Sequence, residues 1–202
     1  MLTVDIPQSV IDFGLGHIDD DSKVVRNEET FMIWEVSESP WEDLTISSGL
    51  VCRHNKPFNL HSDTFFETNR CNLIIPLQMT AEQSLLVMDQ TYEDSAVWVP
   101  NTESNKTGTD PDNLFNNKPC ETDGVVGLTG EEVQESLVPY LYYDKAFYFG
   151  LTGTAWVWEI GKGGIFSPNQ IHGTGNMNDS FKTTMTLWFD NTPEEVHACL
   201  TA

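Results

Sequence analysis

The sequence predicts a mostly β protein, a sandwich or an open barrel with few helices. Its 202 residues are enough for one domain with a buried core. Short runs of β-branched and aromatic residues alternate with Gly, Pro and Asn, which is the pattern of strands joined by turns. Many short strands with few helix signals favour sandwiches and barrels. We expect strands at Asn72–Leu77, Ser84–Met88, Ala96–Val99, Ala146–Ile160, Gly164–Phe166 and Phe181–Phe189.

Three segments carry helix signals. Ser39-Pro40-Trp41-Glu42 combines a capping serine, a proline at the first helical position and a glutamate three residues after the serine. Pro193-Glu194-Glu195, which follows Thr192, predicts a short helix near the C-terminus. Thr129–Leu137, which ends before Pro139, predicts a third helix.

The acidic residues indicate how the chain is organised. Residues 93–135 hold ten acids against two bases, whereas residues 140–192 hold four acids against three bases. A nearly neutral segment rich in β-formers is typical of a sheet core beside solvated connections. We expect a single domain over 1–202, with 1–45 as an N-terminal flanking segment and 101–135 as a long acidic insertion. This insertion is either a lid or binding segment or a plain surface loop.

The net charge excludes several classes of partner. Ten Lys and Arg against 31 Asp and Glu give a formal net charge of −21. Phosphates of nucleic acids and anionic membranes would repel such a chain, so we expect no nucleic-acid and no membrane partner. The sequence shows no signal peptide and no apolar run of transmembrane length. Its four cysteines form no C-x-x-C pair, and we expect a cytoplasmic protein with reduced thiols.

The last predicted strand, Phe181–Phe189, has two different faces. Alternation places an apolar set on one face and a polar set with one cation on the other. A polar face that points into a barrel needs a ligand, water or partners, which predicts a pocket. An ordinary half-exposed strand with its lysine in solvent would give the same pattern. The residues of the polar face are Lys182, Thr184, Thr186 and Trp188.

Two short motifs could begin a metal site. In His61-Ser62-Asp63 an extended backbone would place the imidazole and the carboxylate on the same side. The similar His17-Ile18-Asp19 lies in an acidic run with no clear strand after it, so the context favours His61 and Asp63. His172 is the candidate for a third ligand. Two histidines and one carboxylate leave open metal positions, as in non-haem Fe(II) oxygenases, although the same groups also suit zinc.

A cation follows the third candidate ligand at a particular spacing. Lys182 lies ten residues after His172, and Thr184 comes two residues later. Together with His61-x-Asp63, this set resembles the Fe(II)- and 2-oxoglutarate-dependent oxygenase superfamily. Members of that superfamily use H-x-D/E…H for iron and a basic residue about ten positions after the distal histidine, often in R-x-S. The resemblance covers roughly residues 58–190 and implies a double-stranded β-helix, a jelly roll with a cupin-like shape and a few flanking helices.

The resemblance also implies roles for particular residues. His61, Asp63 and His172 would be the catalytic Fe(II) ligands, and Lys182 and Thr184 would bind the far carboxylate of 2-oxoglutarate.

Asn72 is favoured over Arg70 as a further contact with this co-substrate, because Asn72 lies within the predicted strand. The implied enzyme is a dioxygenase that hydroxylates a small molecule or a side chain and decarboxylates 2-oxoglutarate to succinate. The chain departs from the usual pattern at Lys182, where many members have Arg, and at Gly163-Gly164, where Gly-Asp is frequent.

Two other hypotheses remain open. A cupin-like metal protein could use the same sheet for other chemistry and would need no contact with Lys182. A metal-free jelly roll could serve for binding or assembly. Among the remaining residues, Trp156 and Trp158 share a strand face and belong either to the core or to the mouth of a pocket. We expect His54 and His197 at the surface and Cys71 in the interior.

Overall fold

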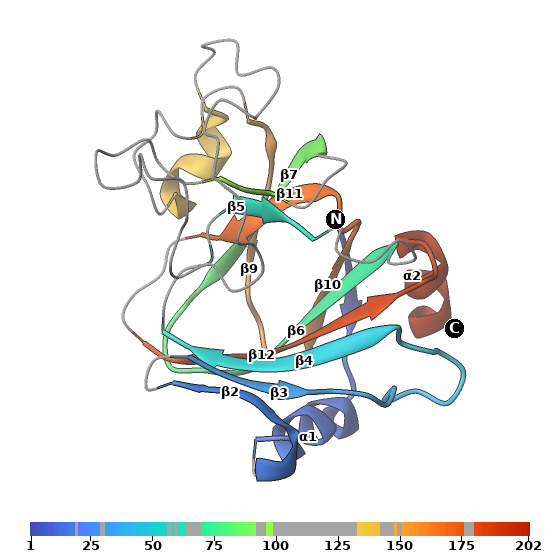
Figure 1. The fold of residues 1–202 in the computed structure, drawn as a ribbon. Helices are drawn as coiled ribbons and strands as arrows, with labels where there is room; N and C mark the ends of the chain where they lie inside the picture. The colour runs from blue at the N-terminus through green and yellow to red at the C-terminus, as the bar shows by residue number, and fades with distance from the viewer. Residues whose placement is uncertain are drawn as a thin grey trace.

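The protein is built from two antiparallel sheets, which lie one above the other in Figure 1. The computed structural model describes residues 1–18, 20–28, 31–55, 58, 60–63, 70–91, 96–98, 133–141, 148, 151–175 and 180–202. One sheet has seven strands in the order β1 (Leu2–Asp5), β10 (Lys162–Phe166), β6 (Cys71–Met79), β12 (Lys182–Phe189), β4 (Ser48–His54), β3 (Phe31–Glu35) and β2 (Val24–Glu28). The other has five, in the order β8 (Ala96–Trp98), β5 (Leu60–Ser62), β11 (Gln170–Thr174), β7 (Ser84–Thr91) and β9 (Gly153–Val157).

Eight of these strands pair in a nested order. β4 pairs with β12, β5 with β11, β6 with β10 and β7 with β9, always antiparallel. The first strand of this set therefore pairs with the last, the second with the last but one, and so on inwards. A long antiparallel hairpin that winds across two sheets in this way is a double-stranded β-helix, or jelly roll. The predicted fold class, a mostly β jelly roll with a few helices, is confirmed.

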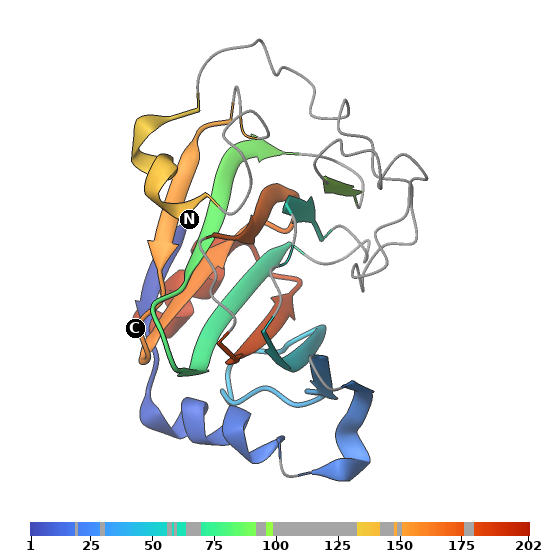
Figure 2. The same cartoon turned by 90° about the vertical axis from the view of Figure 1, so that its left-hand side faces the viewer.

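Both faces of β12 are buried, each against a different layer. Met185, Leu187 and Phe189 belong to the main hydrophobic cluster. That cluster also contains Val10 of α1 (Gln8–Gly16) and Val196 of α2 (Pro193–Thr201). The helices thus cover the outer face of the seven-stranded sheet, and α1 lies beneath the strands in both views (Figures 1 and 2).

The other face of β12 points between the sheets. All four residues of its predicted polar face line the pocket described below. Lys182 is 1% exposed, so the alternative of a half-exposed strand with its lysine in solvent is wrong.

The predicted helices have three different outcomes. The C-terminal helix is confirmed, and Thr192 caps it in a reciprocal capping box with Glu195. No helix forms at Ser39-Pro40-Trp41-Glu42, although Trp41 N–H does donate to Ser39 Oγ at 3.2 Å. The cap forms a local turn there, because a run of β-branched and polar residues follows instead of an apolar helical stripe.

The third helix prediction holds only in part. Residues 129–132 lie outside the described part of the chain, and a 3₁₀ helix covers Glu135–Tyr140 with Pro139 inside it. The predicted insertion 101–135 also lies outside the described residues, apart from 133–135.

The strand predictions match β6, β7, β8, β10 and β12, and the exception is the segment 146–160. Residues 146, 147, 149 and 150 lie outside the described part of the chain. Among the described residues of this segment the strand covers Gly153–Val157, and the chain turns at Gly161, whose φ of 92° favours glycine. The sequence analysis missed α1, β1 to β5 and β11. Among the described residues, no helix is long and apolar enough to cross a membrane.

Candidate metal centre

The two candidate histidines come from neighbouring strands of the five-stranded sheet. His61 on β5 and His172 on β11 are direct partners in the antiparallel register. Side chains at directly opposed positions share one face of the sheet and lie close together. The two imidazole rings are 4.2 Å apart between centroids, and Phe166 packs 4.7 Å from the ring of His172. The strand pairing therefore brings together two histidines that are more than one hundred residues apart in the sequence.

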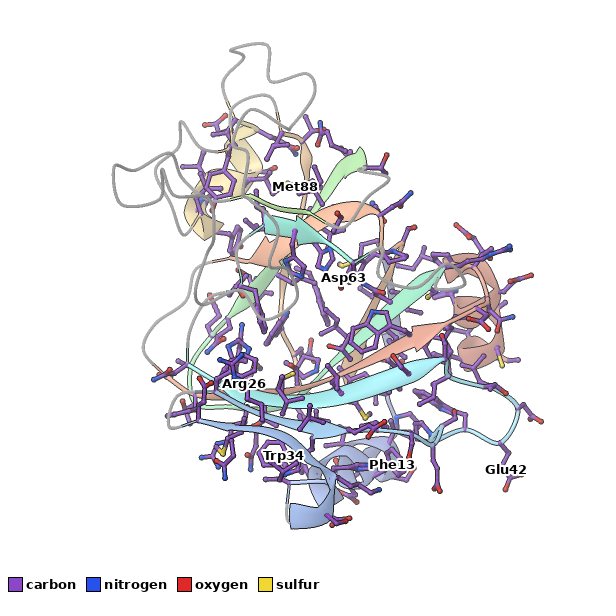
Figure 3. The ribbon with its side chains drawn as sticks, viewed as in Figure 1. Phe13, Arg26, Trp34, Glu42, Asp63 and Met88 are labelled. Carbon is purple, nitrogen blue, oxygen red and sulfur yellow. The ribbon has the colours of Figure 1, made fainter. Side chains whose placement is uncertain are left out.

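Asp63 completes the cluster just beyond the end of β5. Figure 3 places it between the two sheets. Its backbone N–H donates to Pro168 O at 2.8 Å, which ties the segment after β5 to the turn before β11. Its carboxylate Oδ1 lies 3.5 Å from His61 Nε2, and Oδ2 lies 3.2 Å from His172 Nε2. All three side chains are enclosed, with exposed fractions of 11% for His61, 7% for Asp63 and 2% for His172.

These separations suit a metal ion. One ligand atom from each of the three residues lies within 4.8 Å of the other two. Two ligand atoms that are each about 2.1 Å from a metal and at right angles to one another lie about 3.0 Å apart. The spacing of Asp63 and His172 is close to that value. Two imidazoles and one carboxylate on the same side of a metal leave further positions open for other ligands.

Hydrogen bonds with neighbouring groups fix the orientation of two of the candidate ligands, His172 and Asp63. His172 Nδ1 donates to Gln170 O at 2.8 Å, because a carbonyl oxygen can only accept. In the neutral ring Nε2 then carries the lone pair, as a metal ligand requires. Asn72 Nδ2 donates to Asp63 Oδ2 at 3.1 Å and fixes that carboxylate.

The pKa of Asp63 follows from the same contacts. Burial alone would raise the pKa of Asp63, but His61, His172 and Asn72 together hold it below its usual value. The carboxylate therefore stays ionised in the interior, which is the form that binds a metal.

A pocket of about 560 Å³, partly open to solvent, begins at this cluster and continues between the sheets. Its described lining combines apolar walls with hydroxyl and basic side chains, and Asp63 is the acid among them. The apolar and aromatic part consists of Leu50, Phe58, Ile74, Leu85, Trp158 and Trp188. The polar part includes His54, Thr174, Lys182, Thr184 and Thr186, with Cys52 beside them.

Lys182 lies inside this pocket. Its Nζ donates to Thr174 Oγ1 at 3.3 Å and lies 4.4 Å from the ring centre of Trp158. In the described part of the chain, no carboxylate lies within ion-pair distance of it. Burial lowers the pKa of Lys182 from 10.5 to about 7. A nearby anion would raise this pKa again, because it favours the charged ammonium.

The structure brings most of the predicted site residues into one place. His61, Asp63, His172, Lys182 and Thr184 all line the pocket. Asn72 donates a hydrogen bond to Asp63, so it lies beside the candidate metal ligands.

The other candidates of the sequence analysis lie elsewhere. Arg70 is exposed. His17 lies at the end of α1, where it contacts Phe13 O and Lys23.

The sequence analysis missed several pocket residues. The prediction that His54 lies at the surface is wrong, since His54 is 1% exposed and lines the pocket. Thr174 was not considered, although its position two residues after His172 on a strand places it on the same face. Trp158 lines the pocket, and Trp156 packs with it in a hydrophobic cluster. Cys71 is fully buried, as expected.

Comparisons with known proteins do not assign this chain to a family. The sequence matches no protein-family model and no curated protein. Among solved structures, it is similar to vicilin from hazelnut (Corylus avellana), with 4% identity and a TM-score of 0.42 over 86% of this chain and 33% of that chain. It is also similar to vicilin from Capsicum annuum, with 5% identity and a TM-score of 0.41 over 83% of this chain and 30% of that chain.

A third similar structure is a mutant of oxalate decarboxylase from Bacillus subtilis, with 9% identity and a TM-score of 0.38 over 83% of this chain and 28% of that chain. The chain thus spans about a third or less of the length of these proteins. Its own strand order, rather than these likenesses, establishes a jelly roll. The cluster of His61, Asp63 and His172 is a group that could hold a metal ion.

Proposed function

We propose that this protein is an Fe(II)- and 2-oxoglutarate-dependent oxygenase that hydroxylates a small molecule or a side chain. The overall reaction converts 2-oxoglutarate, dioxygen and a C–H bond into succinate, carbon dioxide and an alcohol. The observation that carries the proposal is the sharing of one pocket by two features. They are a three-residue metal cluster with open positions and a buried lysine without a carboxylate partner among the described residues.

The metal ligands have the chemistry that Fe(II) accepts. Neutral imidazoles and a carboxylate suit first-row divalent metals, and the open positions suit a co-substrate and dioxygen. When bound, iron would supply the activation of dioxygen. At the metal end of the pocket, the chain's own residues orient the ligands. The Nδ1–H of His172 is held by Gln170 O, and Asn72 holds the carboxylate of Asp63, so neither ligand needs to reorient.

At the other end of the pocket, the proposal assigns the far carboxylate of 2-oxoglutarate to Lys182 and Thr184. The protein carries a net charge of −21, and a dianion needs a local cation to enter it. Lys182 supplies one in a buried setting where a charge-assisted hydrogen bond is strong. The apolar walls, Leu50, Ile74 and Leu85, limit the access of water to this bond.

The test is formation of succinate from 2-oxoglutarate by protein loaded anaerobically with Fe(II) and then exposed to air. We expect wild-type protein to form succinate even without an identified substrate. Asp63→Ala should abolish this activity, whereas Asp89→Ala, which changes an exposed aspartate at the end of β7, should retain it. Lys182→Met should raise the KM for 2-oxoglutarate, and Lys162→Met, at an exposed lysine paired with Asp5, should not.

Two outcomes would overturn the proposal. No succinate from iron-loaded wild-type protein would favour a metal-free module or a cupin-like protein with other chemistry. A metal-dependent activity that Lys182→Met leaves intact would favour the cupin-like alternative, which does not need the lysine.

A further inference from the structure

Besides Lys182 and Thr184, this end of the pocket contains two more hydrogen-bonding side chains. Thr174, at the end of β11, is 4% exposed. Its Oγ1 accepts hydrogen bonds from Phe58 N–H at 2.9 Å and from Lys182 Nζ at 3.3 Å. A threonine hydroxyl has two acceptor sites and one donor. With both acceptor sites used by these contacts, the remaining capacity of Thr174 is to donate its own hydrogen.

His54 lies at the same end. It is the direct partner of Lys182 in the antiparallel register of β4 and β12. Directly opposed residues on one sheet face have Cβ atoms about 5 Å apart, so the imidazole of His54 and the side chain of Lys182 lie next to each other. The ring of His54 packs against Phe58 at 4.5 Å and against Phe31 at 5.5 Å between centroids.

Phe58 connects these groups into one cluster. Its backbone forms two hydrogen bonds with Thr174, because Phe58 N–H donates to Thr174 Oγ1 and Thr174 N–H donates to Phe58 O at 3.0 Å. The wall that holds the imidazole is therefore fixed to the residue that contacts the lysine. Three donor side chains from β4, β11 and β12 converge here.

The charge balance of this cluster favours an anion. Lys182 provides a positive charge, while Thr174 and His54 provide hydrogen-bond donors. In the described lining of the pocket the acid is Asp63, and its two oxygens already face His61, His172 and Asn72. A buried cation surrounded by donors is satisfied by a carboxylate that accepts from all of them.

We propose that Thr174 and His54 join Lys182 and Thr184 as a clamp for the far carboxylate of the co-substrate. The inference rests on the proposed function and adds two positioning residues that the sequence resemblance does not assign. The ammonium supplies the charge, and the hydroxyl and the imidazole each supply a hydrogen bond. The clamp selects a 2-oxo acid that ends in a second carboxylate over one that ends in a methyl group.

The experiment measures the affinity of Mn(II)-loaded protein for 2-oxoglutarate and for 2-oxobutyrate, which lacks the far carboxylate, by isothermal titration calorimetry. Thr174→Val removes the hydroxyl at nearly constant volume, and His54→Phe keeps an aromatic ring between Phe31 and Phe58. The matched control is Thr183→Val, because Thr183 is buried on the opposite face of β12.

We expect each of the two clamp variants to weaken 2-oxoglutarate binding by about ten- to 150-fold, the usual effect of one hydrogen bond to a charged group. Binding of 2-oxobutyrate should be unchanged in both, and the control should change neither affinity. His54→Gln, which keeps an N–H donor, should recover part of the loss. Equal weakening of both acids would show a merely structural role and overturn the inference, as would unchanged binding of 2-oxoglutarate.

A second arm separates this inference from the proposed function. If metal-loaded wild-type protein binds no 2-oxoglutarate, the proposed function fails, and glutarate is titrated into metal-free protein instead. Glutarate binding that Thr174→Val and His54→Phe weaken would uphold the clamp as a dicarboxylate site. Absence of glutarate binding, or binding that both variants leave unchanged, would overturn it.

Discussion

Replacing Lys182 by methionine should change the pH dependence of stability in a defined way. Methionine keeps most of the apolar stem of lysine but removes the ammonium group. Burial lowers the pKa of Lys182 from 10.5 to about 7, with a smaller opposing effect from Cys52. The unfolded chain therefore binds this proton more tightly than the folded chain. As pH falls from 10.5 towards 7, the unfolded state gains stability, so wild-type protein loses stability relative to the variant.

The size of the effect follows from the two pKa values. Each pH unit between them is worth about 1.4 kcal/mol. From about pH 9.5 to about pH 7.5, the free energy of unfolding of wild-type protein should fall by about 2–3 kcal/mol more than that of Lys182→Met. The neighbouring Cys52 does not disturb this window, because burial raises the pKa of its thiol to about 12. His54, the cross-strand neighbour of Lys182, is present in both proteins. Its contribution to the pH dependence of stability therefore cancels in the difference between wild type and Lys182→Met.

The assay is urea unfolding of metal-free wild-type and variant protein at a series of pH values, followed by tryptophan fluorescence. The difference between the two free energies should shrink steadily as pH rises and level off above about pH 10.5. Lys162→Met, at an exposed lysine, is the control and should show no such loss of stability at neutral pH. A difference between wild type and Lys182→Met that does not vary with pH would refute the reasoning.

Three further predictions concern the core, the α2 cap and the accessibility of the cysteines. Met185→Ala should reduce the free energy of unfolding by about 2–5 kcal/mol in urea titrations, because Met185 is fully buried between β12 and the helices; a loss under about 1 kcal/mol would contradict this packing. Thr192→Ala should cost about 1 kcal/mol in the same assay through loss of the α2 cap, and a neutral effect would argue against the capping box. A thiol reagent at neutral pH should label Cys199 in the folded protein, while Cys52 and Cys71 should react only after unfolding, because burial raises the pKa of each thiol to about 12. Peptide mass spectrometry identifies the labelled sites, and rapid labelling of Cys52 would contradict its enclosure.

The sequence was sufficient to predict β12 and the grouping of His61, Asp63 and His172. Strict alternation in Phe181–Phe189 separates Lys182 and Trp188 from Met185 and Leu187, and the structure buries the two sets against different layers. Residue type and context, rather than spacing alone, singled out His61, Asp63 and His172, because metal sites use particular ligand types.

The first 62 residues were harder to interpret. The helix α1 buries Val10, Ile11 and Gly14 and has no side-chain cap, so it carries little local signal. The strands β2 to β5 show weak alternation in their sequences, and pairing with other strands of the two sheets stabilises them.

His54 shows why part of the pocket could not be predicted. A single histidine with no acid two residues later looks like a surface group. It enters the pocket because β4 pairs with β12 in a register that puts it opposite Lys182. Such long-range register depends on tertiary packing and is not encoded by any short motif.

The most direct test of the central claim is an anaerobic titration of 2-oxoglutarate into Fe(II)-loaded protein, followed by visible absorption. Co-ordination of a 2-oxo acid by ferrous iron gives a weak charge-transfer band. We predict that the band saturates at one 2-oxoglutarate per chain in wild-type protein and does not form in Asp63→Ala. No band from iron-loaded wild-type protein, or an equal band from Asp63→Ala, would contradict the assignment of His61, Asp63 and His172 as the iron site.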